Sequence, residues 1–295
     1  MSARAGSSQP SATPIVPGRY AEYASSGALR PFVECFWTRE AGAPLGDARV
    51  PRVHRVLPDG CIDLLVEFPS ANASGPASAM AVGTMTRALV LDAEDAGSFI
   101  GVRFRPGKAT AFLHLPACEL TDLHVSLGDV WSDASAVHDA LAAAPDVPAR
   151  MRVLERLLIE RLADGGTGDQ RDVDEAVRRI QAAGGSLGIT RLAPSLGVTR
   201  QHLARRFARL VGVPPKVFAR VVRLRRVIER VRAAESERAL NWTALALEAG
   251  YYDQAHLVDE FRELAGVTPS AWARSSGIGS DLVIPFFQDR GHSCG

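Results

Sequence analysis

The chain has 295 residues, of which 46% are hydrophobic and 23% charged, which is enough for two folded units and typical of a globular protein. No run of about 18 apolar residues is present, which excludes a membrane-spanning helix, and the four cysteines lie too far apart to predict a zinc ribbon or a disulfide framework. The formal net charge is only +1, so the chain as a whole has no electrostatic preference, and a reducing cytoplasm is the expected location.

The first part of the chain predicts strands. Residues 1–18 are rich in Ser, Ala and Pro and lack an apolar core, so we expect a disordered start and no signal peptide. From residue 19 to 131 the apolar runs are short and separated by Pro and Gly, as in Ile62 to Phe68 and Phe99 to Phe104. These runs predict a β-rich unit, a small barrel with helical additions.

Residues 132–170 carry apolar residues at roughly helical spacing, interrupted by Pro145 and Pro148. We expect one or two helices there, and a stripe of this kind indicates packing or a dimer contact rather than a ligand site. The Gly-rich stretch from Asp164 to Asp169 predicts a flexible linker.

A helix-turn-helix follows. Asp172 and Glu175 have the spacing of a capping box, which predicts the start of a helix. The stretch from Thr190 to Gly197 predicts a short helix, and Thr199 predicts the N-cap of a second helix over Arg200 to Leu210. Gly at the junction permits the sharp turn that joins the two helices.

The same pattern occurs a second time. Trp242 to Glu248 predicts a short helix, Gly250 a turn, and Asp253 the N-cap of a helix over Gln254 to Leu264. Between the two units, Lys216 to Arg232 predicts one long helix whose apolar residues can face both units at once. Two motifs attached to one rigid helix could reach neighbouring major-groove segments, about 34 Å apart.

These elements predict an α+β chain. Residues 1–18 form the disordered N-terminus, 19–131 a β-rich sensing or dimerisation domain, and 132–170 a helical connector and linker. Residues 171–274 form an all-α domain with two helix-turn-helix motifs joined by a long helix, and 275–295 form a C-terminal tail whose apolar segment has an open role.

A cationic stretch lies between Arg191 and Arg232. It holds twelve Lys or Arg residues against one acid, Glu229, although the whole chain is nearly neutral. Codon bias in a GC-rich genome explains the preference for Arg over Lys but not this clustering. Helices with such a charge suit a polyanion, and DNA is the first candidate.

Several motifs of the helical half occur together: Leu192-Ala193 with Leu196 to Thr199, Ala249 to Leu257, and Gly266 to Pro269. With them, residues 172–274 resemble the DNA-binding domain of AraC/XylS-type bacterial transcription regulators. The resemblance implies binding to double-stranded DNA at an operator or promoter, with RNA polymerase as an expected partner.

The first half contains Leu57 to Leu64, Gly101 to Pro106 and Leu120 to Asp122. Through these motifs it resembles a sensor-like domain found ahead of such regulators. This second resemblance implies a cupin-like fold and names no ligand.

The resemblance also places candidate DNA contacts by position, with base reading in the first unit on Arg200, Gln201, Ala204 and Arg205. Arg can grip guanine in a bidentate fork and Gln can pair with adenine, whereas Arg206 and Arg209 are expected to contact phosphate or local acids. A solvated helix face is the alternative for any one of them. The full candidate set is Thr199, Arg200, Gln201, His202, Arg205, Arg206, Arg209, Gln254, Ala255 and His256.

The second unit departs from this pattern because residues 233–274 carry three basic and seven acidic residues. Asp259 and Glu260 are predicted to lie on the outward face, where carboxylates would repel phosphates. We therefore expect weaker DNA binding by this motif, through Gln254 and His256.

An enzymatic reading finds little support. His54, Asp59, Cys61 and Asp63 are close in sequence and could ligate a metal in a cupin-like barrel, but no H-x-H pair is present. No P-loop, G-x-S-x-G or G-x-G-x-x-G motif occurs. We expect no enzyme activity, cofactor or metal, and a metal-binding cupin-like enzyme fused to a DNA-binding domain remains the lesser alternative.

The sequence thus predicts a sequence-specific DNA-binding transcription regulator of the AraC type, controlled by a small-molecule effector in the first half. The alternative is a ligand-independent DNA-binding protein whose first half forms a homodimer or recruits a partner protein. Effector, operator, and activation or repression are left open.

Overall fold

The structure is a computed structural model that describes residues 20–25, 27–40, 53–68, 78–92, 98–164, 169–234 and 240–274. The predicted disordered start, the C-terminal tail and most of the predicted linker lie outside the described residues. Within the described part, no helix combines the length and apolar character needed to cross a bilayer.

The first part of the chain is an antiparallel β structure, which we call the sheet part. Six strands form one sheet in the order β1-β2-β7-β4-β5-β8, and β3 pairs with β6 in a second, two-stranded sheet. The strands are β1 (Tyr20–Tyr23), β2 (Val33–Arg39), β3 (Val53–Val56), β4 (Ile62–Phe68), β5 (Ala79–Val82), β6 (Leu89–Asp92), β7 (Ser98–Phe104) and β8 (His124–Ser126). The α+β class with a β-rich first half is confirmed.

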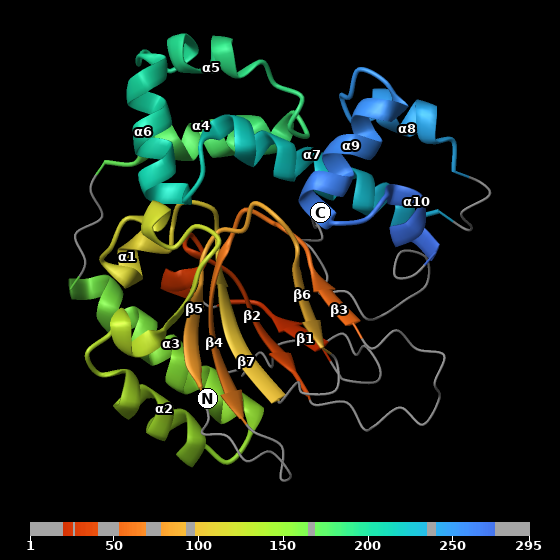
Figure 1. The fold of residues 1–295 in the computed structure, drawn as a ribbon. Helices are drawn as coiled ribbons and strands as arrows, with labels where there is room; N and C mark the ends of the chain where they lie inside the picture. The colour runs from red at the N-terminus through yellow and green to blue at the C-terminus, as the bar shows by residue number, and fades with distance from the viewer. Residues whose placement is uncertain are drawn as a thin grey trace, which may run out of the picture.

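One face of the large sheet is apolar. Phe36, Val102 and Leu64 lie side by side across β2, β7 and β4, and all three belong to one buried core. Helices α2 (Ala134–Ala143) and α3 (Val147–Asp164) complete this core. The residues expected to form a connector therefore pack against the sheet instead of standing apart from it (Figure 1).

Shorter helical turns join these elements. They are η1 (Gly27–Leu29), α1 (Thr110–Leu113), η2 (Ala117–Glu119) and η3 (Leu127–Asp129).

The second part of the chain is entirely helical, and we call it the helical part. Figure 1 shows α4 to α10 gathered over one end of the sheet part, with α7 between the group α4 to α6 and the group α8 to α10. Its helices are α4 (Arg171–Ala182), α5 (Ile189–Ser195), α6 (Arg200–Val211), α7 (Pro215–Arg232), α8 (Trp242–Glu248), α9 (Gln254–Ala265) and α10 (Pro269–Trp272).

Helix α7 is the shared rod that the sequence predicted. Phe218 and Val222 pack into the core of the first unit, while Leu224 and Ile228 pack into the core of the second. It begins at Pro215, where the missing N–H of proline costs no helical hydrogen bond. Because both units share one helix, the rod constrains their relative orientation.

Candidate DNA interface

The first helix-turn-helix consists of α5 and α6. Thr199 caps α6, since its hydroxyl oxygen accepts a hydrogen bond from the His202 amide at 3.1 Å. Gly197 turns the chain between the helices with φ +70°, a left-handed conformation that favours glycine. Leu203 and Phe207 are buried against α4 and α7, which fixes the opposite face of α6 toward solvent.

That solvent face carries the predicted base-reading residues. Arg200, Gln201, Arg205 and Arg209 are all exposed along α6. Within the described part of the chain, none of these arginines forms an ion pair. Their donors are therefore available to an anion approaching α6, whose N-terminal end also carries the positive end of the helix dipole.

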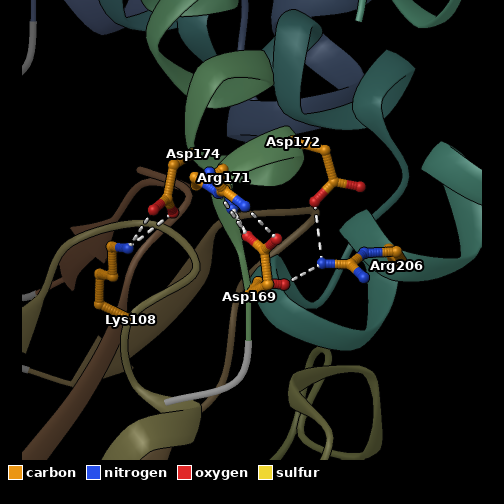
Figure 2. Close-up of polar contacts among 6 residues, drawn as sticks. All are labelled: Lys108, Asp169, Arg171, Asp172, Asp174 and Arg206. Carbon is orange, nitrogen blue, oxygen red and sulfur yellow. Dashed lines mark hydrogen bonds and ion pairs between the residues drawn. The ribbon is translucent and has the colours of Figure 1, made fainter. Parts of the chain in front are cut away.

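Arg206 is held differently from its neighbours. Figure 2 shows its guanidinium directed at the start of α4, where it pairs with the Asp172 carboxylate at 2.9 Å and donates to the carbonyl of Asp169. His202 lines the same open hollow beside α4. Of the candidate DNA contacts, these two are turned toward the protein, and Arg206 contacts a local acid.

The predicted capping box at Asp172 is wrong. Helix α4 begins at Arg171, and Asp169 rather than Asp172 accepts from a backbone N–H at the helix start, that of Arg171 at 3.1 Å. Asp172 lies inside the first turn and forms an ion pair with Arg206. Asp174, also in the first turn, forms an ion pair with Lys108 of the sheet part, with 2.6 Å between Oδ2 and Nζ (Figure 2).

The second helix-turn-helix, α8 and α9, repeats the local geometry. The Asp253 carboxylate accepts from the His256 amide at 2.7 Å, and Gly250 makes the turn with φ +86°. Gln254, Ala255 and His256 are exposed at the start of α9. The Gln254 side-chain oxygen accepts from the Thr243 hydroxyl at 2.9 Å, which orients its amide.

The predicted outward position of Glu260 is wrong. Its side chain is buried and accepts hydrogen bonds from Arg220 Nε and Arg223 Nη2 of α7, both at 2.9 Å. The Arg223 guanidinium in turn lies 5.2 Å from the Tyr251 ring centroid. Only Asp259 of the predicted acidic pair is exposed, and it lies 3.5 Å from Arg262 Nη1, so Glu260 adds no outward carboxylate.

These pairings narrow the cationic surface. Several of the twelve basic residues between 191 and 232 form ion pairs inside the protein, among them Arg206, Arg220, Arg223, Arg225 and Arg230. Exposed cations remain on the first unit and at the start of α7, namely Arg191, Arg200, Arg205, Arg209 and Lys216. The footprint for a polyanion therefore centres on α6, not on the whole stretch.

The sheet part contains a polar cluster that the sequence pattern did not predict. On the face opposite the apolar core, Arg103 of β7 lies beside Asp63 of β4, and its Nε is 3.2 Å from carboxylate oxygens of both Asp59 and Asp63. The Trp37 indole N–H donates to Asp63 at 2.8 Å. Burial raises the pKa of Asp63 to about 6, against the opposing effect of Arg103. Asp59 and Asp63, considered above as metal ligands, thus share an arginine.

Two family models match the chain. Residues 192–275 match the model described as "Helix-turn-helix domain", and residues 21–126 match "Domain of unknown function (DUF6597)". Together with the paired motifs on one rod, the first match shows that the helical part contains a helix-turn-helix domain.

Comparison with solved structures gives distant likenesses. The C-terminal domain of AraT, a response regulator from Geobacillus stearothermophilus, is 21% identical, with 42% of this chain and 95% of that chain covered and a TM-score of 0.33. ToxT from Vibrio cholerae O395 is 10% identical, with 81% and 97% covered and a TM-score of 0.40. The xylose-binding transcription activator XylR is 16% identical, with 44% and 40% covered and a TM-score of 0.31. Among curated proteins, none matches this chain.

Proposed function

We propose that this protein is a sequence-specific transcription regulator that inserts α6 into the DNA major groove. Arg200, Gln201 and Arg205 read base edges there, while Arg209 contacts phosphate. The observation that carries this proposal is the selective exposure of arginines on α6. Other arginines of the same stretch are paired with internal acids, and those of the α6 outer face are not.

The second unit takes a lesser part in base reading. Gln254, Ala255 and His256 occupy the start of α9, and the nearby Asp259 carboxylate opposes a phosphate. The first unit supplies most of the DNA affinity, and the second adds selectivity at a neighbouring half-site. Whether the protein contacts RNA polymerase or occludes it from the promoter decides between activation and repression.

Selection of bound sequences from random duplexes tests this proposal and provides the operator. On that operator, Arg205→Ala should lose about 1–3 kcal/mol of discrimination at one or two base positions. Arg209→Ala should weaken binding to all sequences alike and reduce the slope of log K against log salt by about 1. Equal losses of base preference in both variants would contradict the division between base and phosphate contacts.

We further propose that a small-molecule effector acts through the polar face of the sheet part. This face carries the buried Arg103 with its two carboxylates and the Trp37 indole, and Gly60, the neighbour of Asp59, lies against Phe218 of α7. Burial raises the pKa of Glu34 on β2, and the positive charges of Arg105 and then of Arg225 in α7 oppose the rise. A molecule that binds here would therefore act on the rod that carries both motifs.

Titration calorimetry of the full chain against metabolite fractions tests the effector proposal. The expected result is a saturable heat that disappears in Arg103→Met, with a change of DNA affinity when the ligand is present. Absence of any saturable signal would favour the second candidate, in which the first half only dimerises or recruits a partner, and sedimentation of the free protein would then be the next measurement.

A further inference from the structure

One short segment of the sheet part is attached to both recognition helices. Residues 84–88 connect β5 of the large sheet to β6 of the small sheet. The hydroxyl of the fully buried Thr84 donates to the Val211 carbonyl at 2.6 Å, and Val211 is the last residue of α6. The Ala88 amide donates to the Leu264 carbonyl at 2.7 Å, in the last turn of α9.

The attachment points lie at the C-terminal end of the second helix in both motifs. The last carbonyls of a helix have no partner within it, and here the sheet part supplies the donors for both helices. Thr121 adds a hydrogen bond to the Gly212 carbonyl at 2.5 Å, and Arg55 adds one to the Ala265 carbonyl at 3.2 Å. The sheet part thus holds α6 and α9 at the same place, the C-terminal end.

The segment itself is braced. Asp122 accepts from the Thr86 amide at 2.7 Å and from the Thr86 hydroxyl at 2.6 Å, and its own amide donates to the Thr84 carbonyl at 3.1 Å. Asp122 holds a left-handed backbone conformation, φ +57°, which is uncommon outside glycine. A Cβ on Gly212 would lie 2.8 Å from the Thr84 hydroxyl, so the close approach of this segment to α6 requires glycine there.

Five residues span at most about 17 Å when fully extended, so a braced segment of this length limits the separation of the two helix ends. Helix α7 joins the same two motifs from the other side. The segment, α6, α7 and α9 thus form a closed ring of contacts.

We propose that residues 84–88 form a positioning element that sets the separation of α6 and α9 and thereby determines which spacing between two half-sites the protein accepts. This proposal rests on the DNA-binding function argued above. Thr84, Thr121 and Asp122 are positioning residues in this role because they touch the helix ends, or the segment that touches them, and no base. An inserted base pair moves one half-site by about 3.4 Å along the duplex, a displacement that a closed ring resists.

The experiment uses the full chain and the operator selected with the wild-type protein. Binding is measured to that operator and to versions with one base pair removed, and with one or two inserted, between the half-sites. The test variants are the double substitution Thr84→Val with Thr121→Val, and separately Asp122→Gly, which tolerates the left-handed backbone. Thr110→Val is the matched control because its buried hydroxyl has no hydrogen-bond partner.

The wild type and Thr110→Val should lose about tenfold in affinity for each one-base-pair change, the scale of one lost base contact. The Thr84→Val/Thr121→Val double variant and Asp122→Gly should lose about threefold or less for the same changes. Each should still bind an isolated half-site of the first helix-turn-helix with wild-type affinity. The ratio of affinities between spacings is decisive, because a merely structural loss would lower binding to all spacings alike.

The outcomes separate the two proposals. Failure of the wild type to select any DNA would refute the proposed function itself. The positioning role would be overturned, with DNA binding intact, if the wild type selected a single half-site. It would also be overturned if a folded test variant depended on half-site spacing in the same way as the wild type. Should the double variant not fold, Asp122→Gly decides the question by the same ratio, and failure of both to fold would show that the segment serves stability instead.

Discussion

At the scale of single residues, Arg206 shows how one arginine in a recognition helix can serve the protein instead of the DNA. Its side chain is one-third exposed and its charge is compensated by Asp172 at 2.9 Å. A compensated charge releases no counterion when DNA binds. Arg206→Ala should therefore leave the slope of log K against log salt unchanged and lower stability by about 0.5–1 kcal/mol.

Arg209→Ala is the control for this measurement, since Arg209 lies one turn further along α6 with its side chain exposed. If Arg206→Ala reduced the salt slope as much as Arg209→Ala, Arg206 would have left Asp172 to bind a phosphate. Urea unfolding of the free protein separates the stability effect from the binding effect.

Asp63 makes a pH-dependent contribution that can be isolated. Burial raises its folded-state pKa to about 6, above the value of an unfolded aspartate, so folding favours the protonated carboxyl. The contribution to stability is therefore fully present below about pH 4 and is lost as pH rises through about 6, with an upper bound of about 3 kcal/mol. Asp63→Asn keeps the acceptor for Trp37 and removes this titration.

The free energy of unfolding, measured in urea from pH 4 to 7.5, tests this contribution. The stability difference between wild type and Asp63→Asn should shift steadily in favour of the variant as pH rises. Asp129→Asn, at an exposed position of η3, is the control and should track the wild type throughout. A difference that stays constant with pH would show that Asp63 is ionised over the whole range.

At the scale of elements, α9 is held to α7 by the buried Glu260 carboxylate. Removing one partner of a buried ion pair leaves the other charge uncompensated, so Glu260→Gln should destabilise the protein by about 2–4 kcal/mol while its DNA affinity hardly changes. Asp259→Asn on the same helix should hardly change stability and should raise DNA affinity, because this exposed carboxylate, which lies 3.5 Å from Arg262 Nη1, opposes phosphate. Thermal unfolding and operator titration of both variants decide the matter, and an increase of DNA affinity in Glu260→Gln would contradict the buried position.

The helices of the two helix-turn-helix motifs were predictable from sequence to within a residue or two because their boundaries are set by local chemistry. Thr199 and Asp253 cap their own helices, and Gly197 and Gly250 turn the chain beside them, so no distant residue is needed. The face on which Glu260 lies was not predictable in this way, since its partners Arg220 and Arg223 are about forty residues away in the chain. Helical periodicity places a residue on a face but cannot tell which neighbouring helix covers that face.

One part of the candidate DNA-binding site was likewise predictable from local sequence, and another part was not. Exposure of Arg200 and Arg205 follows from the periodicity of α6 alone. The ion pair between Arg206 and Asp172 depends on how α4 packs against α6. The hydrogen bonds from residues 84–88 to the helix ends depend on how the sheet part packs against the helical part. Contacts of this long-range kind carry no local sequence signal.

At the scale of the whole molecule, the sheet part and the helical part share a core. Leu57 of the sheet part is 2% exposed and packs among residues of α7, α8 and α9. Gly60 lies so close to α7 that a Cβ there would approach the Phe218 ring to 2.5 Å. Ligand occupancy on one part can therefore shift the population of states in the other only by changing contacts across this shared surface.

Calorimetry tests whether the shared core makes the two parts cooperative. The wild type should unfold in one transition whose calorimetric and van't Hoff enthalpies agree. Leu57→Ala should cost about 2–4 kcal/mol and allow the helical part to melt first, because the α7 to α9 core loses a buried side chain from the sheet part. Leu123→Ala, at a side chain 49% exposed, is the control and should change stability by less than about 0.5 kcal/mol. Two separate transitions already in the wild type would mean that the parts are coupled by their linker alone, and the effector proposal would then lack a physical route from the sheet to α7.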